Sequence, residues 1–148
     1  MSKSDKFEYD FLKQTFNGTP ITNQSASGGS TNIWMALLTA DPGDAGSTAA
    51  EGGYAAYART LTDRSTGATG WNVTSGTSAA NASASPVGNV DFPQVATTST
   101  GTFTHFATYP TSNGVAADML YGGTVTPNIN FGQNVIPRLT TGSSITED

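Results

Sequence analysis

The sequence predicts a mainly β protein, a single β-sandwich or jelly-roll-like domain with one short N-terminal helix. Segments with the composition of strands recur at intervals of roughly 8–12 residues, and Gly-rich turns separate them. A helical pattern occurs at the N-terminus. The 148 residues are enough for one domain that buries about two-thirds of its unfolded surface. We therefore expect a helix over residues 1–18 and one β domain over 19–148, with a Ser/Ala/Gly-rich arm or loop at 75–88.

Residues 2–17 have the pattern of a capped helix. Ser2 or Ser4 can cap its N-terminus, and Asn17-Gly18 is a helix stop signal. At 3.6 residues per turn, its apolar side chains fall on two nearly opposite sides. These sides are Tyr9, Leu12 and Phe16 on the one hand, and Phe7 and Phe11 on the other. One sheet cannot cover both, so we expect one side to pack on the domain and the other on a neighbouring molecule; the alternative is that a loop covers it.

The first strands are predicted from apolar runs and alternation. Ile33–Thr39 is apolar on both faces, which is typical of a buried central strand, and Asp41-Pro42-Gly43 supplies the turn after it. Trp34 lies within this run and is expected in the core. Further strands are expected at Ala55–Arg64, Trp71–Thr74 and Asn89–Phe92.

A pair of strands, Thr100–Tyr109 and Met119–Thr126, is expected near the middle of the fold. Thr, Phe, Tyr and Val suit a pleated, half-buried surface, and Asn113-Gly114 between the two segments favours a turn. Simple alternation places Phe103, His105, Ala107 and Tyr109 on one face, with Phe106 among threonines on the other. Shorter strands are expected at Ile129–Phe131, Val135–Leu139 and Ser144–Thr146, the second limited to an edge or bulge by Pro137.

The segment Ser75–Gly88 contains almost no large side chain, so it offers little apolar area against its ordering entropy. We expect a loop, or an arm that neighbouring molecules order across a subunit boundary. The expected intermolecular contacts are therefore Ser75, Ala80 and Pro86 from this segment, together with Phe7, Tyr9, Phe11, Leu12 and Phe16 from the helix.

Composition excludes several classes of protein. Charged residues make up 11% of the chain and the net charge is −5, with the six basic residues scattered. No basic stripe is present to neutralise phosphates, so nucleic-acid binding is not expected. The absence of cysteine removes disulfides and thiolate chemistry. Ile33–Leu38 is too short to span a bilayer, and the N-terminus lacks the apolar core of a signal peptide, so we expect a soluble protein made without Sec-type export.

The sequence offers few groups for chemistry. His105 lies in mid-strand, where a hydrogen bond to a neighbouring threonine or a carbonyl is expected rather than catalysis, and no GxSxG motif occurs. Asp41 and Asp44 share a loop with Glu51 nearby, but their spacing differs from a calcium loop. Turn-forming roles are expected for them, and a weak cation site is the alternative. We expect no catalytic residue, no cofactor and no dedicated metal site.

A series of turn and strand motifs runs along most of the chain. In order, the motifs are LLTADPGDAG, GGYA with YAR following, WNVTSG, VDFP, TGTFTHFATY, DMLYGGTVT and ITED. The series resembles a widespread family of small bacteriophage virion proteins, described as tail-fibre or minor structural proteins. The chain departs from the family where Ala56 and Tyr57 interrupt GGYAR. The resemblance implies a structural role and carries over no catalytic or ligand residue.

We interpret the chain as a non-enzymatic virion structural protein, made in the bacterial cytoplasm and displayed on the outer surface of the particle as a homo-oligomer. The first hypothesis is a capsid-decorating (cement) protein packed on the major capsid protein, because low charge and a two-sided helix suit a position between subunits. The alternative is a tail-fibre or tail-tip component that contacts a host receptor, through glycans among other ligands. It comes second because the sequence has no stalk of repeats or heptads. A carbohydrate-binding module is a third hypothesis, with Trp71 and Tyr57 as the residues to test.

Overall fold

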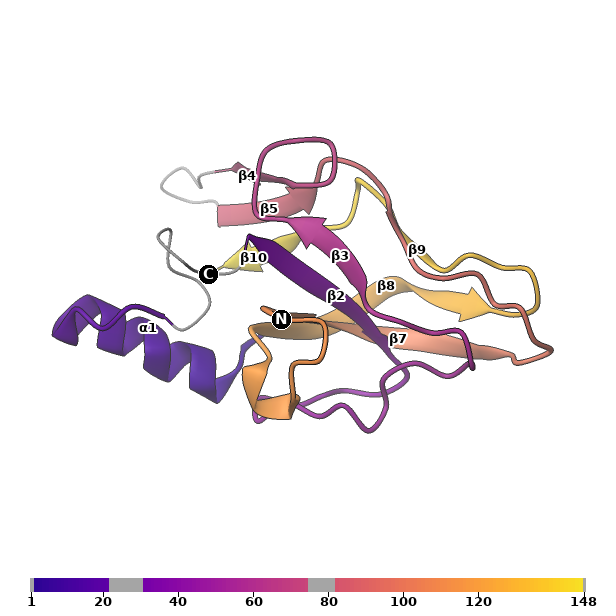
Figure 1. Ribbon diagram of the computed structural model, residues 1–148, viewed down its shortest axis with the longest axis horizontal. Coiled ribbons are helices and arrows are strands. Elements are labelled where there is room, and N and C mark those ends of the chain that lie inside the picture. The colour runs from indigo at the N-terminus through magenta and orange to yellow at the C-terminus, as the bar shows by residue number, and fades with distance from the viewer. Residues whose placement is uncertain (1, 22–30, 75–81, 148) are drawn as a thin grey trace.

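The computed structural model describes residues 2–21, 31–74 and 82–147. Within these residues the protein is mainly β, with three antiparallel sheets and one α-helix (Figure 1). The first sheet has the strand order β1-β8-β7-β2-β3, the second β10-β5-β4 and the third β6-β9. The elements are β1 (Ser2–Lys3), α1 (Asp5–Asn17), β2 (Asn32–Leu38), β3 (Thr60–Asp63), β4 (Trp71–Thr74), β5 (Ala82–Pro86), β6 (Val90–Asp91), β7 (Gly101–Tyr109), the 3₁₀ turn η1 (Ala116–Asp118), β8 (Tyr121–Phe131), β9 (Arg138–Leu139) and β10 (Ile145–Glu147).

The five-stranded sheet has a packed core on each face, which gives the molecule its sandwich-like layers. Met35 and Leu37 of β2 pack into a larger core with aromatic side chains and with residues from the two smaller sheets. Ala36 and Leu38 pack on the opposite face, with Tyr109 and Met119. The prediction that the Ile33–Thr39 segment is a central strand with two buried faces is therefore confirmed.

The central pair of strands forms as predicted, but its faces and its second strand differ from the prediction. The register between β7 and β8 shifts between Phe103 and His105, so simple alternation does not continue along β7. As a result, Phe103 and Phe106 pack in the same larger core, although alternation places them on opposite faces. Tyr109 packs in the other core.

Strand β8 is one continuous strand where two were predicted. It runs from Tyr121 to Phe131, beginning two residues later than the predicted Met119–Thr126 strand and including Ile129–Phe131, and it contains Pro127, which cannot donate to a ladder. The structure accommodates this proline at the register shift, where residues 125–128 lie between the paired residues Thr124 and Ile129. A local gap in the ladder therefore does not end the strand.

Two further predictions need correction. Only Thr60–Asp63 of the Ala55–Arg64 segment is a strand, because Gly52 and Gly53 adopt positive φ angles and Tyr57 N–H closes a turn on the carbonyl of Tyr54. Within the Ser75–Gly88 segment, Ala82–Pro86 forms β5, the middle strand of the second sheet. Small side chains there allow close pairing with β4 and β10. Residues 75–81 lie outside the described residues.

The turn at residues 51–59 is fixed by a buried ion pair between Glu51 and Arg59. Arg59 Nε and Nη2 donate to the two oxygens of Glu51, each at 2.7 Å, and the side chains are only 8% and 12% exposed. The guanidinium also lies 3.5 Å from the centroid of the Tyr109 ring. The pair therefore attaches this turn to the second core of the five-stranded sheet.

We expect Glu51→Ala to lower the free energy of unfolding by about 3 kcal/mol, because it leaves the Arg59 charge buried without its carboxylate. Asp91→Ala is the matched control, since it breaks the Arg138 pair, whose side chains are each 45% exposed, and should cost less than about 1 kcal/mol. Urea unfolding of both variants measures the difference. Equal, small losses would show that Arg59 is not held by Glu51.

Candidate assembly surface

Helix α1 is attached to the β domain at its first turn. Ser4 caps the helix, with its Oγ accepting from Phe7 N–H at 3.2 Å. The same Oγ donates to the carbonyl of Met119, and Ser4 N–H donates to the carbonyl of Leu120 at 3.1 Å. The preceding residues form β1 against β8, in the part of the chain for which only helix was expected. The start of α1 is thus fixed by backbone bonds to the body.

The two apolar sides of α1 have different environments. Phe7 is half-buried and packs edge-on against Tyr121 of β8, with ring centroids 5.4 Å apart. Tyr9, Leu12 and Phe16, on the other side, are 61%, 53% and 78% exposed. We call these three residues the α1 stripe. Phe11 is also exposed, at 55%.

The helix extends away from the sheets (Figure 1), and no residue of α1 is buried. Gly18, with φ of 65°, ends it in the left-handed conformation, as the stop signal predicts. Transfer of a large apolar side chain from water to a packed contact is worth roughly 1.5–3 kcal/mol. The α1 stripe is therefore a surface that gains considerably from a partner.

The other residues predicted at an intermolecular contact do not join this surface. Ser75 and Ala80 lie outside the described residues. Pro86 is buried in β5, directly opposite Trp71 of β4. It lines a pocket that opens partly to solvent, beneath β10.

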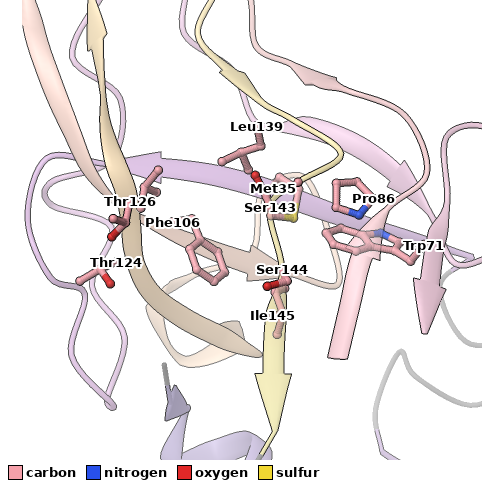
Figure 2. Close-up of a pocket in the computed structure, with 12 residues that line it drawn as sticks. Met35, Trp71, Pro86, Phe106, Thr124, Thr126, Leu139, Ser143, Ser144 and Ile145 are labelled. Atoms are coloured by element: carbon pink, nitrogen blue, oxygen red, sulfur yellow. The ribbon is translucent and has the colours of Figure 1, made fainter. Parts of the chain in front are cut away.

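That cavity, of about 230 Å³, lies between the five-stranded sheet and β10. Figure 2 shows Met35, Trp71, Pro86 and Phe106 around it, with the hydroxyl-bearing Thr124, Thr126, Ser143 and Ser144 at its side. Its lining residues include no histidine, carboxylate or amine. A hydroxyl nucleophile there has no adjacent base to activate it.

A second pocket, of about 550 Å³, lies over the buried ion pair and is lined by Trp34, Tyr57, Glu51, Arg59 and Asn113 among others. Sequence reasoning missed it, because residues 34, 51, 59 and 113 converge only through tertiary packing. Arg59 Nη1 and Tyr109 Oη are buried and, within the described residues, form no hydrogen bond. These two polar atoms are closed off from solvent and are not available to a ligand in the pocket.

The tyrosine beside this ion pair is strongly perturbed. Tyr57 Oη accepts from Leu37 N–H at 2.9 Å and donates to Glu51 Oε1 at 3.4 Å. Burial, followed by the negative charge of Glu51, raises the pKa of Tyr57 far above its ordinary value. Tyr57 is thus a structural hydrogen-bonding group, and its ring stacks on Phe92 in the larger core.

The remaining predicted residues have structural roles. His105 Nδ1 lies 2.8 Å from Thr104 Oγ1, which is the predicted bond to a neighbouring threonine. Asp41 Oδ1 accepts from Gly43 N–H, the expected turn-forming role. Across residues 2–21, 31–74 and 82–147, no group of three or more His, Asp or Glu side chains could hold a metal ion.

The tryptophans exchange their expected roles. Trp71 is only 9% exposed and donates from Nε1 to Thr62 Oγ1 at 3.1 Å. Trp34, expected in the core, is partly exposed and lines the pocket over the ion pair. Trp71 therefore lacks the exposed ring face that the hypothesis of a carbohydrate-binding module needs, whereas Tyr57 is partly exposed and lines the pocket over the ion pair.

We expect stability to fall with rising pH in the alkaline range partly because of Tyr57. Above pH about 10, the unfolded chain loses a tyrosine proton that the folded chain keeps, so unfolding becomes more favourable as the pH rises. Tyr57→Phe has no such proton, and its stability should fall less steeply above pH 10, by up to about 1.4 kcal/mol per pH unit. Urea unfolding from pH 7 to 11 gives both slopes. Identical slopes would show that Tyr57 ionises in the folded protein.

Among the described residues, no helix is both long and apolar enough to cross a membrane.

Comparison with known proteins identifies the family. A search of curated proteins finds no match. A scan against protein families matches residues 2–146 to the family described as Podophage GP4 fiber I protein gp80. The match covers nearly the whole chain, including α1 and all three sheets, and the chain therefore belongs to this family of phage fibre proteins.

Proposed function

We propose that this protein is a structural, non-enzymatic component of a phage tail fibre and that the α1 stripe holds it in the virion. The family match over residues 2–146 is the observation that carries the proposal. It favours the tail-fibre alternative over the capsid-decorating hypothesis, which rested on composition and on the lack of a repeated stalk. The pocket of about 230 Å³ beside β10 also agrees with a structural role, because its lining includes no basic group that could activate a hydroxyl.

The geometry of α1 supports its part in assembly. The helix begins at a fixed joint, because Ser4 bonds both to α1 and to the chain before β8. Its stripe exposes Tyr9, Leu12 and Phe16, whereas Phe7 is already used in packing on the body. A partner that covers the stripe buries apolar area without having to displace a contact of the β domain.

We further propose a division of roles along the chain. The helix of residues 1–18 makes the assembly contact, and the single β domain of residues 19–148 forms the exposed body on the outer surface of the virion. In that position the body is the part that can reach a host receptor. Synthesis in the bacterial cytoplasm and association with tail proteins belong to the same proposal.

We expect a Tyr9→Ser/Leu12→Ser/Phe16→Ser variant to fold normally and yet to be largely missing from virions. The three stripe residues are exposed and belong to neither core, so thermal unfolding should stay close to wild type while the assembly contact is lost. Quantitative mass spectrometry of purified particles measures incorporation, and Gln14→Ser, an exposed change off the stripe, is the control.

Labelled antibody and electron microscopy of wild-type particles test the location. Label at the tail is the expected result. Label distributed over the head, with a copy number that follows the capsid subunits, would instead support the capsid-decorating hypothesis. Full incorporation of the stripe variant would show that another surface holds the protein.

A further inference from the structure

The pocket of about 550 Å³ over the buried ion pair combines aromatic rings with small hydrogen-bonding groups. Trp34 and Tyr57 line it and are both partly exposed. The exposed hydroxyl and amide side chains in its lining are those of Thr48, Ser112 and Asn113. Small-molecule sites are typically pockets of several hundred Å³ with aromatic walls and a few placed polar groups. The size and lining of this pocket therefore fit a small polar ligand.

Two parts of the fold, distant in the sequence, form the walls of the pocket. Trp34 lies in β2, paired with β3 on one side and with β7 on the other. Asn113 lies in the turn after β7, beside the buried Gly114. A Cβ added at Gly114 would lie 3.1 Å from Tyr109 Cδ1 and 3.4 Å from Arg59 Nη1, so the glycine lets this turn approach the ion pair closely. The aromatic wall and the amide are thus placed by the fold itself.

The described part of the lining carries no net charge. Its two charged residues are Glu51 and Arg59, and two hydrogen bonds of 2.7 Å join them to each other. The remaining guanidinium nitrogen, Arg59 Nη1, is closed off from solvent. The whole chain also has a net charge of −5, which repels anions. The pocket therefore favours a neutral ligand over one that carries a carboxylate, sulfate or phosphate group.

A neutral sugar ring has the chemistry that this lining requires. One face of a pyranose presents C–H groups that pack on an aromatic ring, and the partly exposed Trp34 offers such a ring. The sugar hydroxyls both donate and accept hydrogen bonds. An asparagine amide offers two donors and an acceptor, and serine and threonine hydroxyls can act as either. A nucleobase would also stack on Trp34, but it has fewer groups to bond with this set of hydroxyls and amide.

We propose that this pocket binds a neutral saccharide residue of a glycan on the host surface. Trp34 is the stacking ring and Asn113 is the main hydrogen-bonding side chain. The proposal rests on the position given above to the β domain as the exposed body of the fibre protein, and it names the class of ligand. A single open site of this kind should have a dissociation constant on the order of 1 mM. Several copies on one virion then bind a surface more tightly through multivalency.

Saturation-transfer NMR on the full-length protein tests the proposal with a defined panel. The neutral probes are glucose, galactose, mannose, rhamnose and N-acetylglucosamine, each as its methyl glycoside and in disaccharides. Glucuronic acid and N-acetylneuraminic acid are the acidic probes, and adenosine is the aromatic one. We expect at least one neutral methyl glycoside to bind, because a glycan residue is linked through the same position. Its disaccharides should bind as tightly or more tightly, and the acidic sugars should bind more weakly.

Variants assign the binding to the pocket. Asn113→Ala removes an exposed amide from a turn, so it should leave the fold intact and weaken binding of the selected sugar about fivefold. Trp34→Leu should weaken binding about tenfold or more, whereas Trp34→Phe keeps an aromatic ring and should lose less. Asn128→Ala is the matched control, because Asn128 is exposed in β8 and lies outside the pocket. Thermal unfolding of each variant confirms that it is folded, and Asn113→Ala decides the test if the Trp34 variants are unstable.

The proposal is overturned if no neutral probe binds, or if Asn113→Ala binds the selected sugar as tightly as Asn128→Ala. Preference for the acidic sugars or for adenosine would also overturn it. Binding of free sugars but not of their methyl glycosides would reject a surface glycan as the ligand. These results are distinct from a failure of the proposed function. A chain that is present in virions and binds no sugar refutes only the glycan site, whereas a chain that binds sugar and is absent from virions refutes the fibre role.

Discussion

The arrangement of the fold depends on the ion pair between Glu51 and Arg59, placed against the ring of Tyr109. Two charges removed from water are stable only if their hydrogen bonds are well formed, and here both bonds between them measure 2.7 Å. To form them, the chain between the two residues must turn, and this turn carries Tyr54 and Tyr57 into the larger core. A polar contact on one face of the five-stranded sheet thereby sets the aromatic packing on the other.

The N-terminal helix differs from this buried region, because its apolar side chains remain exposed. Its first turn is held by the polar bonds of Ser4, and its length is left in solvent with three large apolar side chains exposed. A helix that is fixed at its first turn and exposes the α1 stripe is suited to binding another molecule. The family match, which includes α1 as well as the sheets, makes fibre assembly the context in which this exposure is explained.

The sequence pattern predicted correctly those features that depend on residues close together in the chain. The Ser4 cap, the Gly18 stop, the buried β2 and the strand at Trp71–Thr74 all depend on neighbouring residues, and the structure has them. The continuous β8 and the shared face of Phe103 and Phe106 were missed, because both follow from a register shift between strands. Strand β5 was missed because its small residues are ordered by β4 and β10 rather than by their own side chains. Arg59 was missed because its partner Tyr109 is 50 residues away in the sequence.

Pro127 has a consequence beyond its own strand. Among the described residues, β1 pairs only with residues 121 and 122 of β8, so most of the outer side of this long strand has no neighbouring strand in the sheet. An open strand edge is a template for pairing with another copy, and a residue without an N–H group in a displaced register interrupts that template. The proline thus limits sheet-to-sheet polymerisation and leaves association to surfaces with defined geometry.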